Sequence, residues 1–309
     1  MQRWLLKAVV QKAISYLPQA HKINYRLQRL TTLRQELPEA FFLDRLTHFR
    51  NHYNFFRKYY AGFQTSYKVL ELGTGWHPIV PLGFYLSGAK NIITLDIRRL
   101  ITDHSLQQTL QRFKQLNQSG RLDQYIPDLQ PDRFQNLLNI TEVNPQPRPY
   151  DFLKELEIDA RQADARHLDL PGGSQDLIIS NNVLQDIAPA ILDQIFPELA
   201  RVAKPGGIMS HVIDMSDQFS HFDAGITPFN YLQFSERQWS LLTNRLQKQN
   251  RCRITFYRTL FQKINLRVLE EVNNMGQVQE LRQVNLHPQF RTIPEKDVLV
   301  LHSHVVGMM

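Results

Sequence analysis

The sequence predicts an α/β protein built on a largely parallel sheet, and three features predict it. A strand expected over residues 68 to 72 leads into the turn Gly73-Thr74-Gly75. Pro78 then suits the first turn of a helix. A second apolar run, residues 91 to 96, ends in an acid about twenty residues after the turn. Strand, glycine turn, helix, strand and acid together form a nucleotide-binding half-unit.

The chemistry of this unit also favours a nucleotide. Glycine readily adopts positive φ and lets the backbone approach a ligand closely, which suits Gly73 and Gly75. The carboxylate of Asp96 can accept two hydrogen bonds from a ribose diol. A turn that binds NAD would carry a glycine where this chain has Pro78. The alternative is a strand, turn and helix that bind no ligand.

Five motifs between residues 69 and 214 resemble those of class I S-adenosylmethionine (SAM)-dependent methyltransferases, most closely the small-molecule branch described as methyltransferase type 11. They are Glu71-Leu72-Gly73-Thr74-Gly75, Asp96, Ala163-Asp164-Ala165, Asp176-Leu177-Ile178-Ile179-Ser180-Asn181, and the segment from Glu198 to Gly207. Members of this family often have a further glycine two residues after Gly75, where this chain has His77.

The resemblance implies a Rossmann-like mixed sheet of seven strands in the order 3-2-1-4-5-7-6, with helices on both faces. It implies SAM as the cofactor, with Asp96 at the ribose and Asp164 at the adenine. The expected cofactor contacts are Glu71, Gly73, Thr74, Gly75, Asp96, Ile97, Asp164, Ala165 and Asn181.

Apolar runs and stop signals place the other elements from residue 67 to residue 309, the expected SAM-binding domain. Helices are expected over 78–88, 189–203 and 236–249, and strands over 176–180, 207–213, 265–272 and 297–305, with a third strand ending near Gln162. That third strand comes about sixty residues later than a compact α/β unit would place it. We therefore interpret residues 98 to 155 as a helical insertion on the ligand side, with helices over 98–119 and 131–140.

Residues 1 to 66 are expected to form an N-terminal helical appendage. Helical spacing predicts helices over 3–17, 22–36 and 39–60. Residues 1 to 68 hold 12 Lys and Arg against three acids, a net charge of +9, and the remaining residues carry a net charge of −2. The basic segment suits an anionic membrane surface, and a solvated basic helix face is the alternative.

The single cysteine, Cys252, cannot form a disulfide within one chain, and no apolar run has the length of a membrane span. These features predict a cytoplasmic protein, with peripheral contact to a membrane as a second expectation.

The carboxyl end of the predicted fifth strand carries four polar side chains within thirteen residues, His211, Asp214, His221 and Asp223. Histidine is a base near neutral pH, and a carboxylate can orient it. Asp214 and His221 are therefore the favoured acceptor-side residues, and His77 is a third candidate because it follows the glycine turn. The alternatives are a divalent metal site, which the irregular spacing supports only weakly, and plain loop hydrogen bonding.

These observations predict methyl transfer from SAM to an oxygen or nitrogen of a small molecule. The basic N-terminus raises the alternative of a nucleic-acid methyltransferase. However, Asn181-Asn182-Val183-Leu184 lacks the prolines of the amino-methylating DNA enzymes, and Cys252 lies far from this motif. A SAM-binding scaffold without catalysis is the third alternative.

Overall fold

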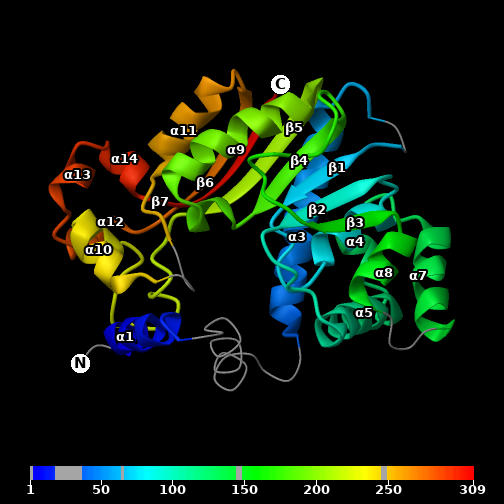
Figure 1. Cartoon of the computed structure of the whole chain (residues 1–309), viewed down its shortest axis with the longest axis horizontal. Coiled ribbons are helices and arrows are strands. Elements are labelled where there is room, and N and C mark those ends of the chain that lie inside the picture. Colours follow the sequence, from blue (N-terminus) through cyan, green and yellow to red (C-terminus); the bar gives the residue numbers. More distant parts are fainter. Residues whose placement is uncertain (1–2, 18–36, 64–65, 144–147, 245–248) are drawn as a thin grey trace.

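The computed structural model describes residues 3–17, 37–63, 66–143, 148–244 and 249–309. Its centre is a sheet of seven strands in the order β3-β2-β1-β4-β5-β7-β6, which confirms the predicted order (Figure 1). The strands are β1 (Val69–Leu72), β2 (Ile92–Asp96), β3 (Ile158–Gln162), β4 (Gln175–Asn181), β5 (Ala203–Asp214), β6 (Arg267–Met275) and β7 (Val300–Met308). β7 runs antiparallel to β5 and β6, and the other neighbouring strands are parallel.

Helices cover both faces of the sheet, so its central strands are apolar on both sides. In β4, Ile179 packs into the core on one face and Ile178 into the core on the other. The first face carries α3 (Glu39–Tyr59), α4 (Ile79–Leu86) and the helices that follow β2, and the second carries α9 (Pro189–Val202) and α11 (Ile254–Lys263) (Figure 1).

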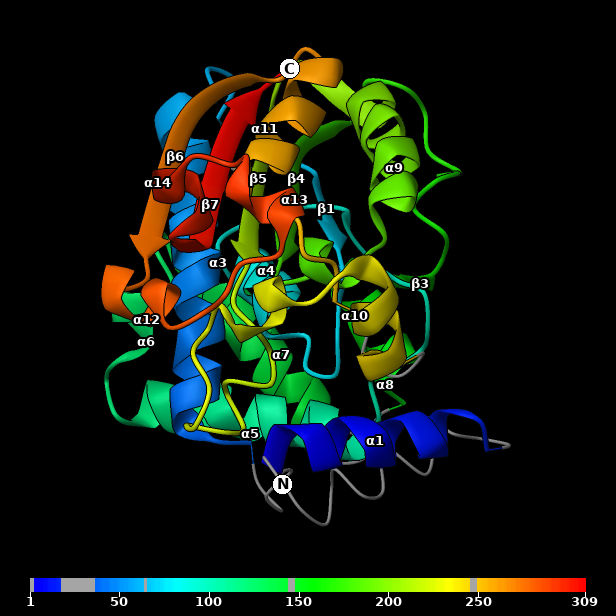
Figure 2. The same cartoon turned by 90° about the vertical axis from the view of Figure 1, so that its left-hand side faces the viewer.

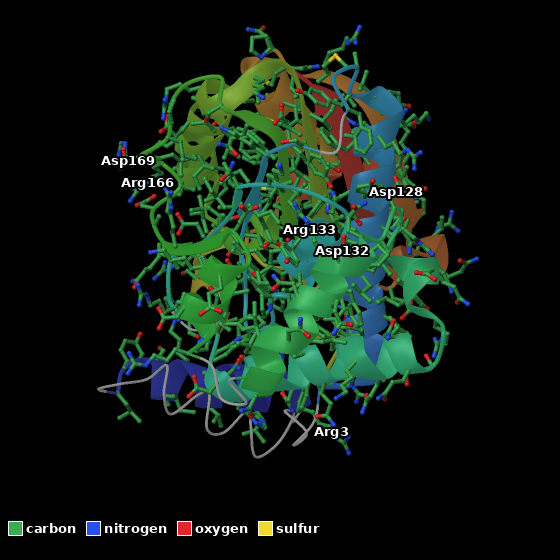
Figure 3. The ribbon with its side chains drawn as sticks, turned by 90° about the vertical axis from the view of Figure 1, so that its right-hand side faces the viewer. Arg3, Asp128, Asp132, Arg133, Arg166 and Asp169 are labelled. Atoms are coloured by element: carbon green, nitrogen blue, oxygen red, sulfur yellow. The ribbon has the colours of Figure 1, made fainter. Side chains whose placement is uncertain are left out.

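The predicted insertion after the second strand is present as helices. They are α5 (Asp103–Gln118), α6 (Leu122–Tyr125), α7 (Pro131–Val143) and α8 (Pro149–Glu155). Arg133, labelled in Figure 3, donates from α7 to the carbonyl oxygens of Tyr85 (2.7 Å) and Ala89 (2.6 Å). A guanidinium at the carbonyl end of a helix is favourable, so this contact ties the insertion to α4.

A third core lies beyond the end of the sheet. It joins α1 (Arg3–Ser15) to the segment after β5 and to short helices near the C-terminus. The segment after β5 contains η2 (Asn230–Gln233) and α10 (Glu236–Leu242), and the short helices near the C-terminus are α12 (Val278–Arg282), α13 (Pro288–Arg291) and α14 (Glu295–Val298). Figures 1 and 2 place α1 at the end of the molecule toward which the parallel strands run. Among the helices in the described ranges, none has both the length and the apolar character needed to cross a bilayer.

The helix predicted over 236–249 is too long, because α10 ends at Leu242. Lys12 of α1 donates to the carbonyl oxygens of Ser240 (2.7 Å) and Thr243 (2.8 Å) at that end. The helix predicted over 22–36 lies outside the described residues. The division of the chain after residue 66 remains a prediction, and α3 itself packs into the main core through Leu46 and Phe49, which are fully buried.

Candidate active site

The glycine turn after β1 has the backbone that the sequence predicts. Gly73 has φ +88° and Gly75 has φ +69°, both in the left-handed region that favours glycine. A Cβ on Gly73 would stand 2.2 Å from Cγ2 of Val183, whereas a Cβ on Gly75 would meet nothing within 4 Å. Gly73 therefore serves close packing against the loop after β4, and Gly75 borders open space.

Asp96, at the carboxyl end of β2, is held against this turn. One carboxylate oxygen accepts from the backbone N–H of Gly75 (3.2 Å) and the other from that of Arg98 (3.1 Å). The neighbouring Ile97 exposes 67% of its surface, so its side chain is open to a ligand. Asp96 and the turn thus form one unit at the edge of the sheet, as the half-unit pattern predicts.

Glu71 and Thr74 form a hydrogen-bonded chain beneath the turn. The Thr94 hydroxyl donates to the Glu71 carboxylate (2.7 Å) and lies 2.5 Å from the Thr74 hydroxyl. Since Thr94 has one hydroxyl proton, Thr74 is the donor in the second bond. Burial raises the pKa of Glu71 to about 7, with the nearby charge of Asp96 acting in the same direction. Glu71 is thus a buried support for the turn.

Asp164 follows β3 and is chelated by its neighbour. The Arg166 guanidinium donates to both carboxylate oxygens of Asp164, with a shortest contact of 2.6 Å (Figure 3 labels Arg166). This pairing holds the pKa of Asp164 down at about 2, so its charge is kept. One of these oxygens, Oδ1, also accepts from the backbone N–H of Arg166 (3.0 Å). Ala165 beside it is buried.

Asn181, the last residue of β4, is fixed by a buried histidine. His52 of α3 contacts the Asn181 side-chain oxygen through Nε2 (2.9 Å) and the Ser210 hydroxyl through Nδ1 (2.7 Å). The same hydroxyl lies 2.8 Å from Nε2 of His304 on β7. Burial, reinforced by His304, keeps the pKa of His52 well below its ordinary value. This polar chain joins α3 to three strands.

Asp214, at the end of β5, is the centre of the candidate catalytic group. Its carboxylate lies 3.7 Å from Nε2 of His221 and 3.3 Å from Nε2 of His302, and it accepts from the Ser216 hydroxyl (2.6 Å). Burial opposes its ionisation, but the contacts from His221 and His302 prevail and hold the pKa of Asp214 well below its usual range. In return, Asp214 raises the pKa of His221.

Two other sequence candidates lie elsewhere. The Asp223 carboxylate accepts from the backbone N–H groups of Trp4 and Gly225, both at 3.0 Å, so it does not orient His221. His211 is fully buried, with its ring stacked on Phe261 at an interplanar angle of 9°. It belongs to the core on the face opposite α3, and we discard it as a candidate base.

His77 lies between the glycine turn and the insertion. Its Nδ1 lies 3.2 Å from the Ser105 carbonyl oxygen and 3.1 Å from the Thr109 hydroxyl, both in α5. Desolvation lowers its pKa, which favours a neutral ring. The contacts are structural ones that fix α5 beside the turn, and they leave Nε2 as the nitrogen for any further role.

The sequence analysis missed His302 and Arg45. His302 lies opposite Asp214 in the antiparallel pairing of β5 with β7, so only the strand register could have found it. Arg45 comes from α3, where its guanidinium lies 3.1 Å from the Asp44 carboxylate. Burial lowers the pKa of Arg45, and the charges of Asp44, Glu71 and Asp214 oppose this shift.

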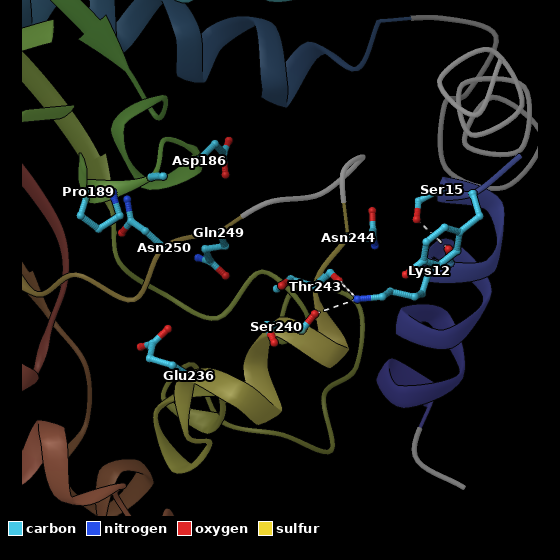
Figure 4. Close-up of a pocket in the computed structure, with 12 residues that line it drawn as sticks. Lys12, Ser15, Asp186, Pro189, Glu236, Ser240, Thr243, Asn244, Gln249 and Asn250 are labelled. Carbon is cyan, nitrogen blue, oxygen red and sulfur yellow. Dashed lines mark hydrogen bonds between the residues drawn. The ribbon is translucent and has the colours of Figure 1, made fainter. Parts of the chain in front are cut away.

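A pocket of about 490 Å³ opens between α1, α10 and the loop after β4 (Figure 4). Asp186, in the short helix η1 (Leu184–Asp186), lines it together with Asn250 and Lys12. Burial raises the pKa of Asp186 to about 6. Gln249, which also lines the pocket, donates to the carbonyl oxygen of Ser216 (2.5 Å), and the Ser216 hydroxyl donates to Asp214, so the pocket lies near the Asp214 group. Within the described ranges, no group of three or more His, Cys, Asp or Glu side chains is arranged to hold a metal ion.

One protein family matches part of the chain by sequence. A sequence family described as a methyltransferase domain matches residues 124–210, from α6 through β4 into β5. No curated protein matches the chain.

Several solved structures also resemble the chain. One is a SAM-dependent methyltransferase from Methanosarcina mazei, with 12% identity, 82% of this chain and 96% of that chain covered, and a TM-score of 0.44. Another is a SAM-dependent methyltransferase from Mesorhizobium loti, with 13% identity, coverage of 84% and 97%, and a TM-score of 0.43. A third is geranyl diphosphate C-methyltransferase from Streptomyces coelicolor, with 11% identity, coverage of 82% and 77%, and a TM-score of 0.42. At these identities and TM-scores, the acceptors of these proteins say nothing about the acceptor of this chain.

The strand order is the one that the resemblance to class I SAM-dependent methyltransferases implies, and the methyltransferase-domain match over residues 124–210 agrees with it. The cofactor of that class is SAM, and the glycine turn, Asp96 and Asp164 lie together with Asp214 along the carboxyl edge of the sheet, where ligands of α/β proteins bind.

Proposed function

We propose that the protein transfers the methyl group of SAM to an oxygen or nitrogen atom of a small-molecule acceptor. The observation that carries this proposal is the Asp214–His221 pair at the end of β5, with its 3.7 Å contact. A base oriented by a carboxylate suits the deprotonation of a hydroxyl or protonated amine.

The proposed contacts to SAM come from the glycine turn and from two acids. In this proposal Asp96 accepts from the two ribose hydroxyls, Asp164 accepts from the adenine amino group, and the open space at Gly75 admits the rest of the ligand. Ile97 supplies exposed apolar surface, while Glu71, Thr74, Ala165 and Asn181 support the edge from below. SAM supplies a methyl group that is already activated, so the protein must mainly align an acceptor and take up a proton.

His221 is the proposed base. Its Nε2 faces Asp214 and the Ser216 hydroxyl (3.1 Å), which assigns the ring N–H to Nε2 and leaves Nδ1 to accept the proton. Asp214 then stabilises the imidazolium that forms, and the acceptor atom gains the methyl group as it loses the proton. His77 is the second candidate, because it follows the glycine turn and keeps Nε2 available.

The pocket beside Asp186 is the proposed entrance for the acceptor. Its lining combines carboxylates, amides and the aromatic ring of Tyr16, which suits a small polar or amphipathic molecule. Gln218 donates to Asp186 (2.7 Å) and belongs to the same segment as His221, so the pocket wall and the proposed base are linked.

The test is a search for labelled products. Cell extract is incubated with the protein and SAM carrying a deuterated methyl group, and products are sorted by mass spectrometry. A label on an oxygen or nitrogen of a small molecule, absent with Asp96→Ala, is the expected result. A label that appears only in nucleic acid would overturn the proposed acceptor class.

A further inference from the structure

Helix α1 has two apolar faces, and only one of them packs against the protein. The inner face buries Trp4, Ala8 and Ile14. The Trp4 ring lies 5.6 Å from that of Phe219 and 5.9 Å from that of Phe234, between ring centroids. The inner face therefore belongs to the third core.

Polar contacts at both ends fix how the helix is turned about its axis. Near its start, the Trp4 backbone N–H donates to the Asp223 carboxylate (3.0 Å), which satisfies a donor of the first helical turn. Near its end, Lys12 donates to the carbonyl oxygens of Ser240 and Thr243. The helix therefore cannot roll to bury its other face without breaking these contacts.

The outer face is an apolar stripe in solvent. At a helical rotation of about 100° per residue, it centres opposite Trp4 and Ala8. Its large members on the helix are Leu6, Val9 and Val10, and Tyr16 and Leu17 follow directly after the helix ends at Ser15; each of the five exposes between 46% and 75% of its surface. A contiguous stripe of this kind on a soluble domain marks an interaction site.

Basic residues flank the stripe. Arg3 is exposed at the outer edge of the molecule (Figure 3), and the Lys7 ammonium lies 4.4 Å from the ring centroid of Phe222, itself 50% exposed. Residues 3 to 17 hold three basic residues, Arg3, Lys7 and Lys12, and no Asp or Glu. An apolar stripe with basic flanks is the pattern of helices that lie in the plane of a membrane surface.

We propose that the outer face of α1 docks onto anionic lipid membranes. A second copy of the same face would bring like charges together, and a nucleic acid would not require the apolar stripe; a membrane with anionic headgroups satisfies both features. Because Lys12, Ser15 and Tyr16 also line the pocket, docking would bring the pocket to the lipid surface. Docking itself does not rest on the proposed methyl transfer, so the two can fail separately.

The test is co-sedimentation of the full chain with two kinds of vesicle, phosphatidylcholine alone and phosphatidylcholine mixed with phosphatidylglycerol. Val9→Glu is the test variant and Val272→Glu the matched control, because Val9 and Val272 are 56% and 54% exposed and Val272 lies on β6. Circular dichroism and the unfolding midpoint establish that both variants are folded. A second test variant, Val10→Ser, removes apolar surface without adding charge.

The wild type and Val272→Glu should bind the mixed vesicles and lose that binding at high salt. Val9→Glu should weaken the binding by at least about tenfold, and Val10→Ser by a smaller factor. Equal binding of all four proteins to the mixed vesicles, or no binding by the wild type, would overturn the proposal. So would a dimer that dissociates on Val9→Glu, because the face would then be an interface between copies.

Discussion

Val183 lies directly over Gly73, so close that a Cβ on the glycine would stand 2.2 Å from Cγ2 of the valine. We predict that Gly73→Ala lowers the free energy of unfolding by about 2–5 kcal/mol, since it combines the strain of a left-handed residue with overpacking. Chemical unfolding measures this loss. Val183→Ala should recover part of it in the double variant, because the nearest remaining valine atom would be Cβ at 3.2 Å. Additive losses would contradict the packing explanation.

Gly75→Ala should behave differently, because the space around Gly75 is open. We expect a loss of only about 1–2 kcal/mol in unfolding free energy, from positive φ alone. SAM affinity, measured by calorimetry, should fall by more than about tenfold, since the new methyl group would stand where the backbone approaches the ligand. If Gly75→Ala bound SAM as tightly as the wild type, the open space at this glycine would not be the cofactor site.

The Asp214–His221 pair predicts a specific pH dependence. A histidine base is active when deprotonated, so kcat should rise with pH through the pKa of His221, which Asp214 raises above 6.5. Asp214→Asn should move this limb to lower pH. His221→Ala should lower kcat by about 10²–10⁴-fold and change SAM affinity by less than about twofold.

The control for this experiment is His77→Ala, measured with the same acceptor. Profiles for the wild type and His221→Ala that agree within about twofold would exclude His221 as the base and shift attention to His77.

The buried histidines should make folding sensitive to acid. Burial, with a contribution from His48, lowers the pKa of His304 to about 4, while the unfolded value is about 6.5. Between these values the unfolded chain binds a proton that the folded chain does not, so stability falls as the pH falls. His304 changes the unfolding free energy by at most about 1.4 kcal/mol per pH unit. Glu71, with its pKa raised to about 7, acts in the opposite direction below that pH.

Unfolding free energies of the wild type and His304→Gln across this window measure the effect. The variant should depend less steeply on pH, by about one proton. Identical slopes would contradict the assignment of a neutral buried ring to His304.

Local patterns were sufficient to predict the strands and helices of the sheet. Apolar runs ending in Gly-x-Gly or in an acid placed β1 and β2, and the resemblance to a family supplied the strand order. Patterns of this kind do not include contacts between distant segments. At the end of α10, the carbonyl oxygen of Thr243 accepts from Lys12, 231 residues away, and no local pattern contains this contact; the sequence pattern continued the helix too far.

The same reason explains which site residues were missed. His302 reaches Asp214 only because β7 pairs with β5, and Arg45 comes from the distant helix α3. Asp223 follows His221 by two residues in the sequence, but its carboxylate satisfies the first turn of α1 instead. The turn and Asp96 were predictable because they are close in sequence, whereas the acceptor side is assembled from segments far apart in the chain.

The most direct test of the account is calorimetric titration of SAM into the wild type and Asp96→Ala. Asp169→Ala, an exposed acid in the loop before β4, is the matched control. Loss of two charge-assisted contacts to the ribose should cost about 1.5–3 kcal/mol, or roughly 10- to 150-fold in affinity, while the control should bind as the wild type does. Unchanged SAM affinity in a folded Asp96→Ala protein would contradict the placement of the cofactor at this turn.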